Sequence, residues 1–513
     1  MPREPARRAA RRGIDIADSA RVRGRRVRSC FRRTGSSGGS GDPRPHNETH
    51  DWRARSQVGE LRRRRPNGAE RRRRRTNSGT QRPGSKRRPR LLAVWYWPGR
   101  HTRPKSQRGD LIVGAPLAGI RVVEIASFVA VPAAGALLAD LGAEVIKVEV
   151  PWGEIYRHAR PRMAGFDNDF PAGPPFQMDN RGKKSLALDL ALPQAQEALS
   201  QVIATADIVI TNVLPARLEK YGLSPDALRE KRPELIVGRL SGYGPEGDRA
   251  NDPAFDYTAF WALSGLMDHL HDLDSPPGWM RPGIGDHSAA MSLVVGILAA
   301  LRSRDVDGKG QVIDVTLQQI GYYINGNDTA LALVTGETPP RHDRRAPRNP
   351  LWNHYRCQDD RWLFLVMIDS DRYWPAFTRS IGRPELAEDE RFNDPSQRFR
   401  NSGELVKTLD EIFAERPLGK WIEPMNAERL IWAPVRTLAE AIHDENAEAN
   451  GGFAVVDHPE YGTFKTVAPP LRMSGHEMDG SNPAPVLSAN TAEVLAEAGV
   501  DEETIALLVA VAD

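Results

Sequence analysis

The sequence is poor in cysteine and contains no long uninterrupted apolar run. Only Cys30 and Cys357 occur in 513 residues, so neither a disulfide framework nor a CxxC metal motif is available. No apolar run approaches the roughly 20 residues that a membrane span needs, and no apolar segment follows the N-terminal arginines as in a secretory signal. These absences favour a reducing, cytoplasmic location and no membrane partner.

Two nucleotide-binding signatures are also missing. No GxGxxG motif follows the first predicted strand, which disfavours NAD chemistry, and no P-loop lysine motif is present, which disfavours phosphoryl transfer. The glycine-rich stretch "SGYGPEG" (241–247) opens no helical pattern, and we predict a loop there.

Charge divides the sequence into two unlike parts. Residues 1–110 hold 33 basic and 9 acidic side chains, whereas residues 111–513 hold 38 basic and 58 acidic ones. The first part offers little apolar surface to bury, so we expect residues 1–112 to be disordered. One interpretation is a nucleic-acid-binding arm. The other, which we prefer because aromatic residues are not interleaved with the arginines, is a mis-set start with the true one near Val113, so a nucleic-acid partner is not expected.

From residue 117 onward, short apolar runs alternate with helical patterns, which predicts an open α/β sheet of Rossmann type. In such sheets ligands bind beyond the carboxyl ends of the strands. The predicted strands are 121–127, 143–150, 184–190, 206–213, 234–242 and the start of 310–333, and the predicted helices are 133–143, 192–204, 225–231, 288–303 and the rest of 310–333.

The pattern also predicts the domain organisation. A large domain begins with residues 113–336, and "ETPPRHDRRAPRNP" (337–350), with four prolines, is a linker. Residues 351–440 form a smaller α+β domain with a hairpin around Asp359-Asp360. The chain then returns to the large domain in 441–513, where 453–475 is β-rich and 491–511 is a helix.

The stretch "RPGIGDHSAAMSLVVGILAAL" (281–301) places a carboxylate, Asp286, directly before an apolar helix. Taken alone, this position is typical of a helix cap, but a carboxylate at a helix N-terminus can also be a nucleophile kept ionised by the dipole. His287 is adjacent, yet neighbouring side chains on a turn diverge, so we expect no His–Asp dyad. His269 and His271 lack a third ligand at suitable spacing, so no metal is predicted.

Several stretches together resemble the family III CoA-transferases, the formyl-CoA and carnitine CoA-transferase type. They include "LAGIRVVEIASFVAVPAAGALLADLGAEVIKVEVPWGE", "NRGKKSLALDL", "GDHSAAMSLVVGILAAL" and "GKGQVIDVTL", and the match runs in order from about residue 117 to 508. The resemblance implies a Rossmann-type large domain with an inserted smaller domain, and an interlocked homodimer. It also implies acyl-CoA and a carboxylic acid as substrates, with no tightly bound cofactor.

By the same resemblance Asp286 is the catalytic nucleophile, which forms covalent acyl and CoA intermediates. Arg157 is a candidate phosphate ligand, whereas Arg181 and Lys183 are structural; for any such cation, a solvated surface charge is the alternative. The positions implied for CoA are Ser127, Phe128, Val129, Arg157, Leu188, Asp189, Asn212, Val213, Lys220, Phe255, Asp256 and Tyr257.

The sequence departs from the family pattern where the substrate is chosen. The glycine loop expected of formyl-CoA enzymes is replaced by "APRNPLWNHYRC", so formate and oxalate are disfavoured. Phe260 and Trp261 resemble members that handle larger or aryl acyl groups, although both could be core residues. Val129, Val150 and Lys220 also differ from the usual residues.

Two rival functions stay open. α-Methylacyl-CoA racemases resemble this sequence too, but their histidine some thirty residues before the Gly-Asp pair is missing from "PAFDYTAFWALSG". A non-catalytic CoA- or nucleic-acid-binding protein is the alternative of another class.

Overall fold

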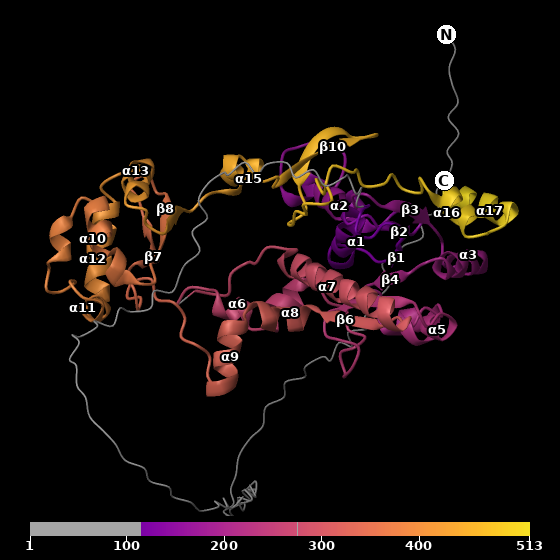
Figure 1. Cartoon of the computed structure of the whole chain (residues 1–513), viewed down its shortest axis with the longest axis horizontal. Helices are drawn as coiled ribbons and strands as arrows, with labels where there is room; N and C mark the ends of the chain where they lie inside the picture. Colours follow the sequence, from indigo (N-terminus) through magenta and orange to yellow (C-terminus); the bar gives the residue numbers. More distant parts are fainter. Residues whose placement is uncertain (1–113, 274, 513) are drawn as a thin grey trace, which may run out of the picture. The chain divides into compact units, whose positions relative to one another are not determined.

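A six-stranded parallel sheet forms the centre of the largest folded part. The structure, a computed structural model, describes residues 114–273 and 275–512, so the predicted segment 1–112 lies outside the described residues (Figure 1). The strand order is β3-β2-β1-β4-β5-β6, and every neighbouring pair is parallel. All six predicted strands are present: β1 (Arg121–Ile125), β2 (Glu144–Glu149), β3 (Lys184–Ala187), β4 (Ile208–Thr211), β5 (Ile236–Ser241) and β6 (Val312–Thr316).

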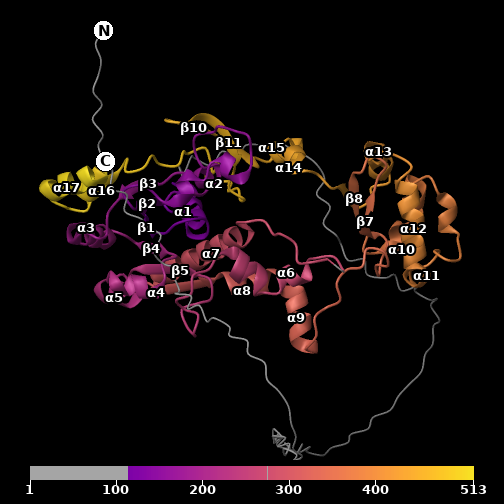
Figure 2. The ribbon, with the colours of Figure 1, turned by 180° about the vertical axis from the view of Figure 1, so that it is seen from behind.

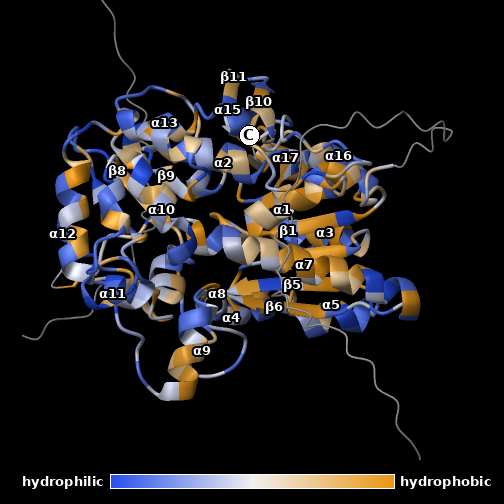
Figure 3. Ribbon diagram, turned by 60° about the vertical axis from the view of Figure 1, so that its left-hand side comes forward, coloured by the Kyte–Doolittle hydropathy of each residue, from blue (hydrophilic) through white to orange (hydrophobic). Residues whose placement is uncertain are grey.

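Helices cover both faces of this sheet because successive strand residues point to opposite sides. Val122 of β1 joins a core with helices α1 and α7, whereas Val123 joins a second core with α3, α16 and α17. Figure 2 shows α16 and α17, from the end of the chain, beside α3. In Figure 3 the strands β1, β5 and β6 are coloured as hydrophobic, as expected for a parallel sheet buried on both faces. The helices of this part are α1 (Ala130–Asp140), α2 (Pro174–Asp179), α3 (Pro193–Ala204), α4 (Pro215–Lys220), α5 (Pro225–Lys231), α6 (Leu266–His269), α7 (Ile284–Asp307), α8 (Leu317–Ile324), α9 (Gly326–Thr335), α16 (Thr491–Glu497) and α17 (Glu502–Ala512), with the short turns η1 (Ile155–His158), η2 (Pro161–Ala164) and η3 (Tyr257–Ala262).

The single helix predicted for 491–511 is wrong. Two helices, α16 and α17, occupy this stretch, and Gly499 between them adopts φ 82, a left-handed conformation that ends a helix at little cost. The region predicted as β-rich contains one antiparallel hairpin, β10 (Phe453–His458) and β11 (Gly462–Val467).

Residues 351–430 supply a third core of their own, which is drawn entirely from this stretch. The three-stranded antiparallel sheet of this region contains the predicted hairpin, with Asp360 at φ 62 in the turn. A third strand of three residues, just beyond residue 430, was not predicted from the sequence. The elements here are β7 (Trp352–Arg356), β8 (Trp362–Val366), α10 (Ser370–Ser380), η4 (Pro384–Ala387), α11 (Pro395–Arg400), α12 (Ser402–Phe413), α13 (Gly419–Ala427) and β9 (Trp432–Pro434), followed by α14 (Leu438–Ala441) and α15 (Glu445–Ala449).

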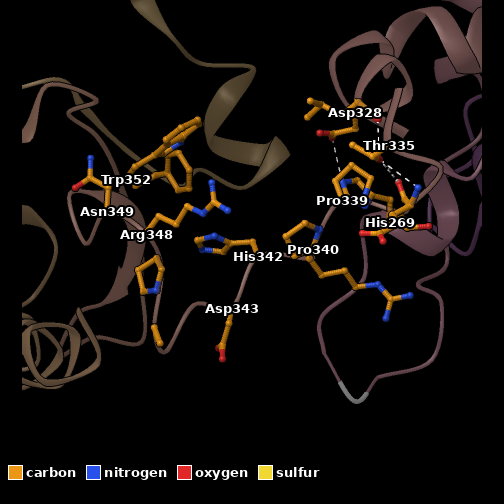
Figure 4. Close-up of a pocket in the computed structure, with 17 residues that line it drawn as sticks. His269, Asp328, Thr335, Pro339, Pro340, His342, Asp343, Arg348, Asn349 and Trp352 are labelled. Carbon is orange, nitrogen blue, oxygen red and sulfur yellow. Dashed lines mark hydrogen bonds and ion pairs between the residues drawn. The ribbon is translucent and has the colours of Figure 1, made fainter. Parts of the chain in front are cut away.

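The segment 337–350 contains neither helix nor strand. Figure 4 shows its Pro339, Pro340 and His342 together with His269 of α6, which lies 3.0 Å from Asp328 of α9. His269 therefore sits on a short helix and pairs with a carboxylate. Among the described residues no group of three or more potential ligands could hold a metal ion.

Helix α7 is the one described helix that is long and apolar enough, by length and composition, to cross a membrane. This corrects the expectation that no apolar segment reaches that length. Core helices of globular proteins pass the same test, and α7 packs against α1, β5 and β6 with residues such as Leu293 and Ile297 fully buried. Its apolar character is therefore accounted for by its place in the first core.

Helix α1 packs tightly on β1 because its residues are small. An added Cβ at Gly135 would lie 2.1 Å from Oε2 of Glu124 and 3.1 Å from Cε of Lys183. These two side chains are fully buried and form an ion pair of 2.7 Å. A side chain at position 135 would therefore have to displace a buried ion pair.

We expect Gly135→Ala to lower the free energy of unfolding by about 1–3 kcal/mol, because neither α1 nor the ion pair can move freely. Urea unfolding followed by circular dichroism would measure this. Gly326→Ala, at the start of α9, is the matched control, because nothing lies within 4 Å of its added Cβ. Equal stability of the two variants would contradict the packing argument.

Candidate active site

Helix α7 begins two residues before Asp286, with Gly283 as its N-cap at φ 85. Asp286 therefore lies in the first helical turn, and the predicted helix start at residue 288 is wrong. The amide of Gly283 donates a hydrogen bond of 2.7 Å to Oδ2 of Asp256, whose carboxylate also accepts from the amide of Gly285. Asp256 thus accepts from two of the free amides of this helix end, and the interpretation of Asp286 as a helix cap is wrong, because Gly283 is the N-cap.

The side chain of Asp286 is half-buried among other acidic groups. Burial and the nearby charge of Asp256 raise its pKa to about 7, while His287 acts in the opposite direction and Asp179 adds a smaller increase. We expected the helix N-terminus to keep this carboxylate fully ionised. Since burial and the charge of Asp256 raise this pKa to about 7, both protonation states of Asp286 are present near neutral pH.

His287 is bound to a different carboxylate. Its Nε2 lies 3.0 Å from Oδ1 of Asp179, the last residue of α2, which is 1% exposed. The ring thus pairs with Asp179, a His–Asp contact that the sequence did not predict, and not with its neighbour Asp286. Tyr156 of η1 lies near the same carboxylates. Burial raises its pKa most, and the charges of Asp179 and Asp286 raise it further.

Gly285 is required by its close contact with Phe260. An added Cβ would lie 2.5 Å from Cγ of that ring, so only glycine lets η3 and α7 approach this closely. Phe260 and its neighbour Trp261 belong to the first core, with ring centroids 4.9 Å apart. Both are core residues, and Phe260 lies directly against Gly285, the residue before Asp286.

The loops after β1 and β4 meet as the predicted sheet requires. Asn212 donates 2.8 Å to the carbonyl of Ser127 and accepts 3.3 Å from its amide. Phe128 adopts φ 67, and its ring lies 5.3 Å from that of Phe255. An added Cβ on Gly283 would lie 4.0 Å from Cγ1 of Val129, so this loop reaches the start of α7.

A buried ion-pair network, formed by Glu124, Lys147, Glu154 and Lys183, lies beneath these loops. Lys147 is 3.0 Å from Glu124 and 2.7 Å from Glu154, and Lys183 is 2.7 Å from Glu124. Glu154 then accepts the amide of Phe128 at 2.6 Å, which fixes the strained loop. Of these four residues the sequence indicated only Lys183 as structural; spacing alone could not reveal the network.

The predicted phosphate ligand, Arg157, is committed elsewhere. Its guanidinium makes two hydrogen bonds to Glu149, donates 2.8 Å to the carbonyl of Pro485 and stacks over Phe176. Because this side chain is 8% exposed, little of it is left for a phosphate. Arg181 is committed in the same way, with three hydrogen bonds to Asp140, and the part of Arg157 in phosphate binding stays a prediction.

The remaining positions implied for CoA make the contacts that follow, and their roles stay predictions. Leu188 is buried, and Asp189 accepts from the amide of Ala191 at 2.9 Å. Lys220 is exposed at the end of α4, with its ammonium over the ring of Tyr221. The amide of Val213 bonds to Thr211, and the ring of Tyr257 lies 5.4 Å from that of Trp279.

We expect Asp286→Asn to stabilise the protein, and more so at pH 8 than at pH 5. The unfolded chain ionises Asp286 near its ordinary pKa of 3.8, whereas the folded protein does so only near 7. The free-energy cost of ionising the folded-state carboxylate therefore grows between these two pKa values and is complete above pH 7. There, Asp286→Asn should raise the free energy of unfolding by about 2–4 kcal/mol.

Thermal unfolding of both proteins at the two pH values would test this. Asp226→Asn is the control, because Asp226 also lies in the first turn of a helix, α5, but is exposed. A gain that is absent or independent of pH would contradict the assignment.

Comparisons with known proteins agree with this arrangement. A family model described as CoA-transferase family III matches residues 117–491. The (R)-2-hydroxy-4-methylpentanoate CoA-transferase of Clostridioides difficile is 32% identical over 393 residues, 76% of this chain and 97% of that protein. The cinnamoyl-CoA:phenyllactate CoA-transferase of Clostridium sporogenes is 30% identical over 390 residues, 75% of this chain and 94% of that protein.

The crystal structure of a CAIB/BAIF family protein from Brucella suis aligns with a TM-score of 0.66 at 28% identity. It covers 75% of this chain and 99% of that one. The matched range contains the parallel sheet, the start of α7 and the residues gathered around Asp286. The chain belongs to CoA-transferase family III and is a CoA-transferase.

Proposed function

We propose that this enzyme moves CoA from an acyl-CoA thioester to a carboxylic acid with Asp286 as the covalent nucleophile. One observation carries the proposal: a half-buried carboxylate with no hydrogen-bond donor among the described residues lies where the loops after β1 and β4 meet α7. A carboxylate left without donors keeps its lone pairs available for attack. Neither the capping of the helix nor an ion pair accounts for it.

The reaction needs only this carboxylate and the two substrates. Asp286 attacks the thioester carbonyl, the C–S bond breaks, and CoA leaves as the thiolate, giving a mixed anhydride. The thiolate then attacks the aspartyl carbonyl and releases the donor acid, which leaves CoA on Asp286 as a thioester. The acceptor carboxylate repeats both steps in reverse and regenerates the free side chain.

The surroundings point to an acyl group larger than formyl. Phe128, Phe255 and Tyr156 form an aromatic wall beside the loop after β1, and Phe255 is 56% exposed. The two relatives above are named for branched and aryl acids, (R)-2-hydroxy-4-methylpentanoate and phenyllactate. We infer a branched or aryl carboxylic acid as one of the two substrates.

The proposal includes a homodimer of Rossmann-type domains. The strand order 3-2-1-4-5-6 is that of dinucleotide-binding sheets. An apolar stripe on α7, formed by Met291, Val295 and Leu298, is exposed in the single chain, and Val295 is 68% exposed. A second copy of the chain would bury this stripe, since monomers rarely leave such surfaces uncovered.

We expect Val295→Glu to weaken self-association, because it places a charge in the middle of that stripe. Sedimentation equilibrium of the full chain would show a dimer for the wild type and a larger monomer fraction for the variant. Val306→Glu, near the end of the same helix and 73% exposed, is the matched control. A monomeric wild type at micromolar concentration would contradict the dimer.

The nucleophile is tested by incubating the full chain with a panel of acyl-CoA thioesters and analysing its peptides by mass spectrometry. We expect a CoA or acyl adduct on the peptide containing Asp286, formed about tenfold faster at pH 8 than at pH 6 because the carboxylate must be ionised.

Asp286→Asn should abolish the adduct, whereas Asp252→Asn, whose carboxylate pairs with Arg249 on the surface, should retain it. An adduct on another residue would contradict the proposal. Deuterium exchange at the substrate Cα without any adduct would indicate racemase chemistry instead.

A further inference from the structure

We propose that His287 is a positioning residue whose imidazolium form, held by Asp179, keeps Asp286 available as a carboxylate. This inference rests on the proposed function, in which Asp286 is the nucleophile. Nothing in the activity of the family by itself assigns a role to His287.

The ring is held so that both nitrogens face acceptors. Nε2 lies 3.0 Å from Oδ1 of Asp179. The other side of the ring faces Gly283, where an added Cβ would lie 3.5 Å from Nδ1, and the Gly283 carbonyl favours the protonated ring. A neutral imidazole has one donor and one acceptor, so only the doubly protonated ring can donate to both oxygens.

Asp179 is built to keep that charge in place. It is 1% exposed, and its Oδ2 has no hydrogen-bond partner among the described residues. Burial raises the pKa of Asp179, and the hydrogen bond and charge of His287 act in the opposite direction, so the carboxylate is stabilised as an anion only beside the protonated ring. The positive groups behind it, Arg181 and Lys183, are already bound to Asp140 and Glu124, which leaves His287 as the cation in direct contact.

The electrostatic surroundings of Asp286 show why this cation matters. Burial raises its pKa most, Asp256, the residue before η3, and Asp179 of α2 raise it further, and His287 lowers it. Tyr156 of η1 faces the same space but is neutral at physiological pH, because its pKa is raised.

The other elements packed on α7 contribute little. The only charged residue of helix α1 is Asp140, which is paired with Arg181, and α8 has no charged residue. Arg239 of β5 and Asp314 of β6 pair with each other. His287 is therefore the cation that offsets the two aspartates.

Burial lowers the pKa of His287, but the hydrogen bond and charge of Asp179, followed by the charge of Asp286 and the Gly283 carbonyl, raise it by more. The imidazolium is thus present below and around neutral pH, the range in which Asp286 itself titrates. Each charge supports the other, so loss of the histidine should move the titration of Asp286 upward.

The first test is an NMR titration of the full chain labelled with ¹⁵N-histidine, with His287→Gln used to assign the signal. We expect both ring nitrogens of His287 to be protonated at pH 7, and Asp179→Asn to shift its midpoint downward. This measurement needs no substrate and stands even if Asp286 is not the nucleophile. A neutral ring at pH 7 in the wild type would overturn the proposal.

The second test is the pH dependence of adduct formation in His287→Gln, which keeps an amide able to donate to Asp179. We expect the midpoint to rise by about one pH unit, with a loss of about fivefold at pH 7 that is recovered at pH 9. Asp256→Asn should shift the midpoint downward, because it removes a negative charge.

The matched control is His269→Gln, which removes a histidine that also lies 3.0 Å from an aspartate but sits on α6. It should leave the midpoint unchanged. A loss in His287→Gln that is the same at every pH would mean a purely structural role and would overturn the inference.

Discussion

The buried ion-pair network under the sheet's carboxyl end is the constraint on which the rest of the site depends. Glu124, Lys147, Glu154 and Lys183 are taken out of water almost completely, and each is tolerable only because an opposite charge is within 3.0 Å. Removing one partner would leave an uncompensated buried charge, so the network holds its geometry firmly. Glu154 accepts a hydrogen bond from the amide of Phe128. The loop after β1 therefore keeps its left-handed turn against the start of α7.

At the start of α7 the protein places carboxylates where they repel one another. Burial raises the pKa of Asp256, two amides of the helix end act in the opposite direction, and Asp286 is left in the first turn with no donor among the described residues. This arrangement costs folding free energy at neutral pH, as expected where a site is organised for reactivity. The packing of the surrounding core, in which Phe260 contacts Gly285 directly, offsets this free-energy cost.

The sequence predicted the six strands because each is an apolar run bounded by turn residues. It predicted Asp286 as a site residue from two signals, the Gly-Asp pair before an apolar helix and the family resemblance. It could not predict the network, because Glu124 and Lys147 lie within short strands where a charged residue usually faces solvent, and their partners are distant in sequence. The partners of Arg157 were not predicted either, because its two hydrogen bonds to Glu149 are formed across a turn. Strand β9 is too short for any pattern.

The pKa of Asp286 near 7 reconciles two opposing demands on a nucleophile. A carboxylate that accepts more hydrogen bonds would have a lower pKa and a larger ionised fraction, but it would be less basic, and basicity supports attack on a carbonyl. A carboxylate buried without any cation nearby would be more basic but almost entirely protonated. Asp256 and Asp179 raise the pKa of the buried Asp286, and His287 limits that rise. The site thus keeps a sizeable ionised fraction at neutral pH while retaining a reactive oxygen, and this balance depends on three side chains that come from three separate parts of the chain.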